Sequence, residues 1–88
     1  MPPQIHPNAL KHLSRDEVLS AWGCVTKCIQ RAGNDEPPRW LCIAWLSDGR
    51  PVELIAVETA DNWLIIHAMT PVQPKLAKEI AQTERRAR

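Results

Sequence analysis

The sequence predicts a small α+β domain in which an N-terminal helix, a three-stranded antiparallel β-meander and a C-terminal helix follow one another. Two observations predict this class. Apolar residues recur at helical spacing near both ends of the chain, and three strand-length apolar runs lie between them. The chain has 88 residues, enough for one hydrophobic core and too few for two. We therefore expect a single domain over residues 1–88, with frayed ends at 1–7 and 84–88.

The first helix begins at a recognisable cap. Ser14 and Glu17 fit a capping box, in which each side chain satisfies a backbone amide at the start of a helix. Apolar residues then follow at helical spacing, so we expect a helix over residues 15–22. Gly23 interrupts this pattern, and the β-branched residues after it leave 24–31 compatible with either helix or strand.

Three strand candidates follow a proline-rich loop. Residues 39–46 are apolar on both alternating faces, which is typical of a central strand buried on both sides. Asp48-Gly49 then supplies the strongest short hairpin signal, with glycine where a positive φ is needed. Residues 51–58 and 62–69 are the second and third predicted strands.

Two further helical segments complete the predicted order of elements. A short helical turn is expected around residues 8–12, before the capping box. Pro74 suits the first position of the C-terminal helix, because its missing N–H has no partner there in any case. The apolar residues of that helix form one stripe: Leu76, Ala77, Ile80 and Ala81.

The hairpin turn also predicts which residues share a face of the meander. With a two-residue turn at 48–49, Glu53 is expected opposite Ala44, on one face with Trp40, Cys42, Ile55 and Val57. The other face is wholly apolar, and we expect both helices to cover it. Its residues are Leu41, Ile43, Trp45, Val52, Leu54 and Ala56.

The face of His67 depends on the loop around residues 60–62. A two-residue loop places His67 with Leu54, and a three-residue loop places it with Ile55, diagonal to Glu53. The sequence leaves both registers open.

Composition and charge limit the classes of function. The chain has four Trp but no Tyr, so no phenol group can act as an acid or a base. No apolar segment is long enough to span a bilayer and no signal peptide is recognisable, so we expect a cytoplasmic protein. The three Cys, an odd number, then indicate free thiols. The net charge of +1 divides into −2 for residues 1–74 and +3 for residues 75–88.

Two polar residues within the apolar strands are the main candidates for chemistry. His67 is either an acid, a base or a phosphate ligand, or a core histidine with one hydrogen-bond partner. Glu53 needs a partner, since an unpaired buried carboxylate is costly. The candidate partners are His67, Arg39, Arg50 and Lys75.

The remaining reactive side chains form no familiar motif. Cys24 and Cys28 lack the spacing and the second ligand pair of a zinc site, so we expect no metal and no other cofactor. The serines have no obvious base, which leaves covalent catalysis unsupported. A histidine with a few cations suffices for RNA cleavage without a metal. A base then activates the ribose 2′-hydroxyl, and cations stabilise the phosphorane.

Several segments occur in an order that resembles a family of short bacterial toxins. His12 and Ser14 precede Pro37-Pro38-Arg39-Trp40-Leu41, Asp48-Gly49-Arg50-Pro51-Val52-Glu53-Leu54 and Ile65-Ile66-His67-Ala68-Met69. Over about residues 10–80 this order is similar to the BrnT group of type II toxin–antitoxin modules, within the wider RelE-like ribonuclease fold. The Ile-Ile-His-Ala-Met segment is its most specific element.

The resemblance implies an α+β sheet with helices on one side, metal-independent RNA cleavage, and a cognate antitoxin that covers the active surface. Carried over to this chain, it implies that His67, Glu53 and His12 are catalytic, with a basic residue after the third strand. Many members have an Arg in that loop where this chain has Gln73, so Lys75 must supply the charge. Further RNA contacts are expected from Arg39, Arg50, Lys78, Arg85 and Arg86.

An alternative interpretation is a non-catalytic module of the same fold that binds a partner protein. A three-stranded sheet leaves both edges open for strand addition, and the basic C-terminal helix offers a second surface. An open edge is also compatible with a homodimer.

Overall fold

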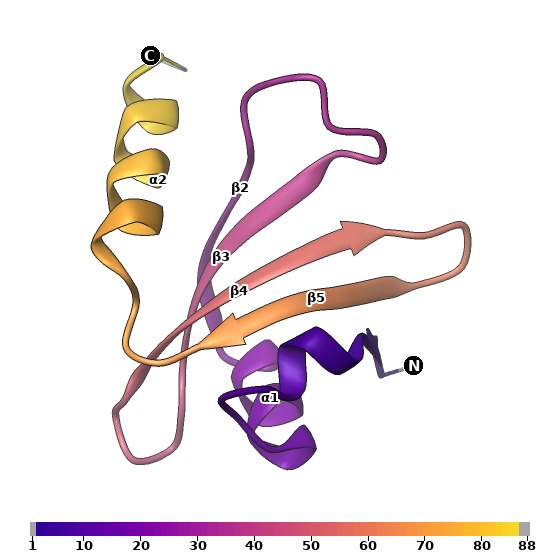
Figure 1. Ribbon diagram of the computed structural model, residues 1–88. Helices are drawn as coiled ribbons and strands as arrows, with labels where there is room; N and C mark the ends of the chain where they lie inside the picture. The colour runs from indigo at the N-terminus through magenta and orange to yellow at the C-terminus, as the bar shows by residue number, and fades with distance from the viewer. Residues whose placement is uncertain (1, 87–88) are drawn as a thin grey trace.

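The computed structural model describes residues 2–86, which build one mixed five-stranded sheet with helices on both faces (Figure 1). The strand order is β1-β5-β4-β3-β2, with β1 parallel to β5 and every other pair antiparallel. The elements in chain order are β1 (Gln4–Ile5), the 3₁₀-helix η1 (Pro7–Leu10), α1 (Arg15–Trp22), β2 (Val25–Gln30), β3 (Arg39–Trp45), β4 (Pro51–Glu58), β5 (Trp63–Met69) and α2 (Pro74–Arg86).

The predicted three-stranded sheet is wrong, because two further strands flank the meander. The antiparallel meander β3-β4-β5 forms the centre, while β2 adds to β3 and β1 adds to β5. β2 comes from the segment that the sequence left open between helix and strand. Its β-branched residues favour an extended chain, and Ile29 packs against the apolar cluster under α2. β1 has two residues, too few for a periodic pattern to reveal.

The predicted start of α1 is confirmed. The Ser14 hydroxyl accepts a hydrogen bond from the Glu17 amide at 3.1 Å, and the Ser14 amide donates to the Glu17 carboxylate at 2.9 Å. The helix spans residues 15–22, as the periodicity predicts. α2 begins at Pro74, also as predicted.

Regular elements lie close to both ends of the described chain. Residues 4–5 form β1, Pro7 starts η1, and 84–86 complete α2, while the fraying expected at 1–7 and 84–88 stays a prediction. Residues 1, 87 and 88 lie outside the described part of the chain.

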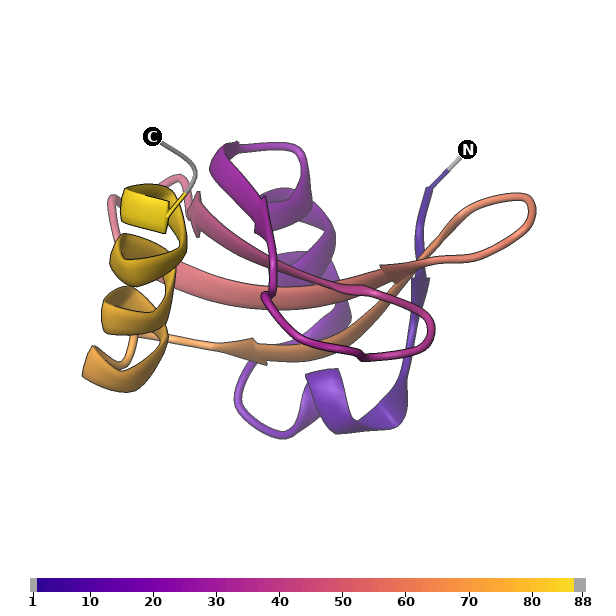
Figure 2. The same cartoon turned by 90° about the horizontal axis from the view of Figure 1, so that it is seen from above.

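The two helices pack on opposite faces of the sheet and not on one face (Figures 1 and 2). α1 and η1 cover a core to which the sheet contributes these buried residues: Cys42, Ala44, Val52, Leu54, Ala56, Ile65 and Ala68. On the other face, Leu76 and Ile80 of α2 pack on Leu41. The strands carry apolar residues on both faces because helices cover both faces of the sheet, although α2 covers its face only in part.

The β3–β4 register differs by one residue from the prediction. Glu53 lies opposite Ile43, whereas the sequence predicts Ala44. The reason is the turn: the Leu46 amide donates to the Arg50 carbonyl, so the loop has three residues, with Gly49 at a φ of 91°. Glu53 therefore shares its face with residues below α2 and not with Trp40 and Cys42.

Three of the four tryptophans belong to the α1 side. The Trp22 and Trp63 ring centroids lie 5.7 Å apart, and Trp40 meets Trp63 edge-on at 6.1 Å. All three pack against the core under α1. Trp45 is 41% exposed, and its indole N–H donates to the Thr26 hydroxyl at 3.1 Å.

α2 is fastened to β2 by charged groups as well as by its apolar residues. Lys27 pairs with Glu84 at 3.0 Å, and Arg31 pairs with Glu79 at 2.6 Å. Glu84 of α2 is thereby bound to β2, and Glu79 of α2 is bound to the residue directly after β2. Neither α1 nor α2 has the length and apolarity that crossing a bilayer requires.

The contacts of Glu17 predict how stability depends on pH. The Ser14 amide and the Arg50 guanidinium, 3.0 Å away, hold the pKa of Glu17 below the ordinary value of 4.5. A lowered folded-state pKa contributes stability above the unfolded value, and this contribution is lost as the pH falls through the folded value. We expect Glu17→Gln to lower the melting temperature at neutral pH and to flatten its decline at acidic pH. Circular dichroism melts across that range measure this.

The matched control for this prediction is Asp16→Asn, which removes one charge from the same helical turn without removing the capping bonds. Equal pH profiles for the two variants would contradict the role given to Glu17.

Candidate functional site

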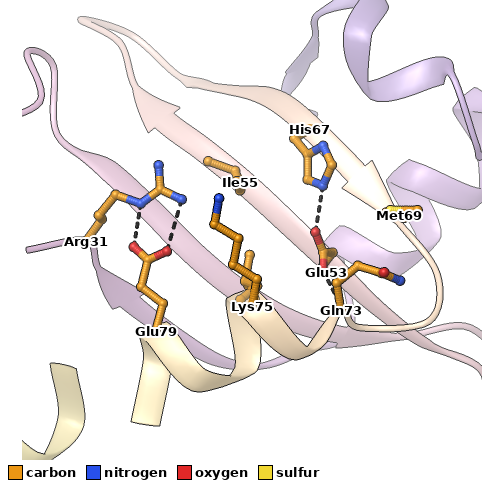
Figure 3. Close-up of a pocket in the computed structure, with 9 residues that line it drawn as sticks. Arg31, Glu53, Ile55, His67, Met69, Gln73, Lys75 and Glu79 are labelled. Atoms are coloured by element: carbon orange, nitrogen blue, oxygen red, sulfur yellow. Dashed lines mark hydrogen bonds and ion pairs between the residues drawn. The ribbon is translucent and has the colours of Figure 1, made fainter. Parts of the chain in front are cut away.

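A pocket of about 330 Å³ lies beside α2, on the part of the sheet face that the helix leaves uncovered (Figure 3). Its volume is in the range of ligand-binding pockets. The lining residues come from the position directly after β2, from β4, β5, the loop before α2 and α2 itself: Arg31, Glu53, Ile55, His67, Met69, Gln73, Lys75, Leu76 and Glu79.

The carboxylate of Glu53 is buried in this pocket. The residue is 4% exposed, and no other charged residue is buried among residues 2–86. One carboxylate oxygen lies 2.7 Å from Nε2 of His67, and the other accepts the backbone N–H of Gln73 at 2.7 Å. These bonds offset the cost of removing the charge from water. The group thereby connects β4, β5 and the loop that leads to α2.

His67 reaches this face through a β-bulge. A four-residue loop, 59–62, joins β4 and β5. If the register at the start of β5 continued unchanged, His67 would point toward α1. Ile66 is then an extra residue in β5 with no partner in β4, and it shifts the alternation by one. His67 consequently lies opposite Ile55, one of the two positions that the sequence left open.

The two ring nitrogens of His67 have different surroundings. The side chain is 33% exposed, and Nε2 is held by Glu53. Within residues 2–86, Nδ1 makes no hydrogen bond. With Glu53 ionised, the shared proton resides on Nε2, which leaves the lone pair on Nδ1 to accept a proton from a ligand. A carboxylate that fixes the tautomer in this way orients a general base.

Two cations border the same pocket. Figure 3 shows Lys75 between the Arg31–Glu79 pair and the His67–Glu53 pair. Arg31 is neutralised by its partner, whereas Lys75 is exposed and forms no salt bridge within residues 2–86. Lys75 is therefore the positive charge that the pocket can offer to an anion.

A second pocket of about 400 Å³ adjoins the first. It is lined by His6, Asn8, Arg39, Ile55, Ile66 and His67. Because Ile55 and His67 line both pockets, His67 stands at their junction. A ligand that contacts His67 and extends both ways would meet Lys75 in one pocket and Arg39 in the other.

The structure brings together three of the four predicted catalytic residues: His67, Glu53 and Lys75. His12 is not among them. It is exposed on the connection between η1 and α1, the elements that cover the opposite face. Of the candidate partners for Glu53, His67 is the one that binds it.

The predicted RNA-binding residues are dispersed. Arg39 lines the second pocket, but Arg50 pairs with Asp48 at 2.8 Å and with Glu17 of α1 at 3.0 Å. Lys78, Arg85 and Arg86 are exposed on α2. Arg85 and Arg86 lie at the far end of that helix (Figure 1), roughly 15 Å from Lys75 at the α-helical rise per residue. Arg88, part of the predicted basic end, lies outside the described residues.

Five polar residues that line the two pockets were not predicted as site residues: Arg31, Gln73, Glu79, His6 and Asn8. Arg31 would have followed from assigning 24–31 as a strand, because antiparallel pairing sets it beside Arg39. The Gln73 amide depends on the path of a loop. His6 is brought near His67 by the pairing of β1 with β5, which two residues cannot reveal.

Comparison with known proteins finds no family model, no curated protein and no solved structure that matches this chain. The similarity to BrnT-like toxins stays a prediction based on motif order. Within residues 2–86, no three His, Cys, Asp or Glu side chains are grouped so that they could hold a metal ion.

The burial of Glu53 predicts a cost for its removal. Glu53→Ala leaves the Gln73 amide and the His67 ring without their acceptor. We expect the free energy of unfolding to fall by about 1–3 kcal/mol, the typical penalty for buried polar groups left unpaired. Urea denaturation measures this. Glu58→Ala, at the exposed end of the same strand, is the control and should change stability little. Equal losses for the two variants would contradict this account.

Proposed function

We propose that this protein is a metal-independent endoribonuclease in which His67 acts as the base. The observation that carries the proposal is the 2.7 Å contact between His67 and the buried Glu53, in a pocket also lined by Lys75, which forms no salt bridge within residues 2–86. The pair supplies proton transfer and Lys75 supplies positive charge, the two requirements of phosphodiester cleavage by the 2′-hydroxyl.

In the proposed reaction, Nδ1 of His67 accepts the proton of a ribose 2′-hydroxyl. The 2′-oxygen attacks the adjacent phosphorus, and the bond from phosphorus to the 5′-oxygen of the next nucleotide breaks. The leaving oxygen takes a proton from Lys75 or from water. The products are a 2′,3′-cyclic phosphate and a 5′-hydroxyl end. Glu53 supports the first step, because its negative charge stabilises the imidazolium that forms.

Lys75 supplies the positive charge that the reaction requires. The phosphorane carries more negative charge than the substrate, so a nearby ammonium stabilises the transition state more than the ground state. Gln73, the neutral residue in the same loop, contributes its backbone N–H to Glu53 and cannot supply this charge. The second pocket provides a place for a neighbouring phosphate, with Arg39 as its cation.

The biological setting is proposed from the sequence resemblance. The order of motifs around Arg39, Glu53 and His67 is similar to that of toxins in type II toxin–antitoxin modules. We therefore propose that the chain acts on RNA in the cytoplasm and that a cognate antitoxin covers the pockets at His67 when the toxin is silent.

RNA cleavage by the purified protein tests the reaction. We expect wild type to cut single-stranded RNA in the presence of EDTA and to leave 2′,3′-cyclic phosphate ends. His67→Ala removes the base and should slow cleavage by about 10²- to 10⁴-fold, the usual contribution of general acid–base catalysis. Lys75→Ala should slow cleavage as well, whereas Lys75→Arg, which keeps the charge, should retain more activity. Product ends are read by mass spectrometry.

His12→Ala is the matched control, since it removes an exposed histidine that lines neither pocket. It should cleave RNA at the wild-type rate. Intact RNA with the wild-type protein, or equal rates for His67→Ala and His12→Ala, would overturn the proposal.

A second candidate function, partner binding without catalysis, is favoured by the edge of the sheet at β2. The structure corrects the expectation of two open edges on the meander, because β2 and β1 flank it. β2 is the outermost strand on its side, and Thr26, Lys27 and Cys28 are exposed there. Trp45 is exposed next to Thr26, and tryptophans of this kind often anchor protein interfaces.

Co-expression with the protein encoded by the adjacent reading frame tests this surface. If the partner docks at β2, Trp45→Ala should weaken its co-purification by tenfold or more, roughly the loss at an interface anchor. The same variant should cleave RNA as the wild type does if the two functions are separate. Unchanged co-purification would exclude this edge as the binding surface.

A further inference from the structure

Two cysteines face one another across β2 and β3. Cys28 and Cys42 are direct partners in the antiparallel register, and their Sγ atoms lie 2.7 Å apart. The Arg31 amide donates to the Arg39 carbonyl at 2.8 Å, which makes that opposed pair a hydrogen-bonded one. Because the two kinds of pair alternate, the cysteines occupy a non-hydrogen-bonded pair, where opposed side chains approach most closely.

This placement suits covalent linkage. Opposed Cα atoms in a non-hydrogen-bonded pair are about 4.5 Å apart. Disulfides accept Cα separations of about 4.4–6.8 Å, so the strands need not move apart or slide for the sulfurs of Cys28 and Cys42 to join.

The two thiols differ in access and in acidity. Cys28 is exposed on the outer strand, whereas Cys42 is 1% exposed in the core under α1. The hydrogen bond from the Cys42 thiol lowers the pKa of Cys28. The same contact, and then burial, raise the pKa of Cys42. The accessible sulfur is therefore the better nucleophile, and the buried sulfur is held next to it.

We propose that Cys28 and Cys42 form a peroxide-reactive dithiol that closes reversibly to an intramolecular disulfide. The Cys28 thiolate attacks hydrogen peroxide, the O–O bond breaks, and a sulfenic acid forms on Cys28 with release of hydroxide. The Cys42 sulfur then attacks the Cys28 sulfur, so the S–S bond forms, the S–O bond breaks and water leaves with the Cys42 proton. The two cysteines lose two electrons and the peroxide gains two.

The disulfide would tie the edge strand to the centre of the sheet. It closes a loop over residues 28–42, which contains the connection from β2 to β3. Lys27 of β2 and Arg31, directly after this strand, both pair with α2, so the strand that becomes fixed is the one to which the helix is attached. The thiols lie on the α1 face and the pockets at His67 on the other, and the dithiol does not depend on the proposed ribonuclease activity.

Peroxide treatment of the full chain followed by alkylation tests the dithiol. We expect wild type to lose about 2 Da, the mass of two hydrogens, and to keep one alkylatable thiol, Cys24. Trypsin separates the three cysteines, because Lys27 lies between Cys24 and Cys28, and Arg31 lies between Cys28 and Cys42. A peptide pair joined through Cys28 and Cys42, and separated by dithiothreitol, is the expected product.

Three variants make the result specific. Cys24→Ser removes the exposed cysteine outside the pair and should form the disulfide as wild type does. Cys42→Ala should instead accumulate a dimedone-reactive sulfenic acid on Cys28. Cys28→Ser, at an exposed position where folding is not at risk, should lose the 2 Da shift and most of the reaction with peroxide. A disulfide that involves Cys24, or sulfinic acid on Cys28 without a cross-link in wild type, would overturn the proposal.

Discussion

The buried carboxylate of Glu53 is the constraint on which the arrangement of the pocket depends. A charge with 4% exposure persists only where both oxygens have partners, and here the partners come from different segments. His67 supplies one partner from β5, and the Gln73 amide supplies the other from the loop before α2. Satisfying one group thus fixes the histidine ring, the path of the loop and the position from which Lys75 extends. The chemical site and the packing of α2 have a common origin.

Local rules predicted much of this structure. The capping box set the start of α1, Pro74 set the start of α2, and the apolar runs located the three central strands to within a residue or so. These features are decided by neighbours in the chain. The prediction that Glu53 needs a partner also held, because the cost of an unpaired buried charge does not depend on the fold.

The features that local rules missed depend on how the strands pair with one another. An extra residue in the 48–49 turn moved Glu53 to the other face, and the Ile66 bulge moved His67 to join it. Neither shift alters composition or periodicity enough to be read from the sequence. The sequence also did not predict that helices cover both faces, because the apolar pattern of a strand does not indicate which element packs on each side. The order of motifs predicted His12 as a site residue, but the fold leaves it exposed on the connection between η1 and α1, away from both pockets.

The distribution of tryptophan gives the two layers different optical signatures. Trp22, Trp40 and Trp63 are clustered on the α1 side, and α2 has no aromatic residue. With no tyrosine or phenylalanine in the chain, near-ultraviolet absorbance and intrinsic fluorescence come from indoles alone. Most of that emission reports on the layer opposite the pocket at His67. Detachment of α2 would therefore reduce the far-ultraviolet helical signal while leaving the surroundings of these three tryptophans unchanged.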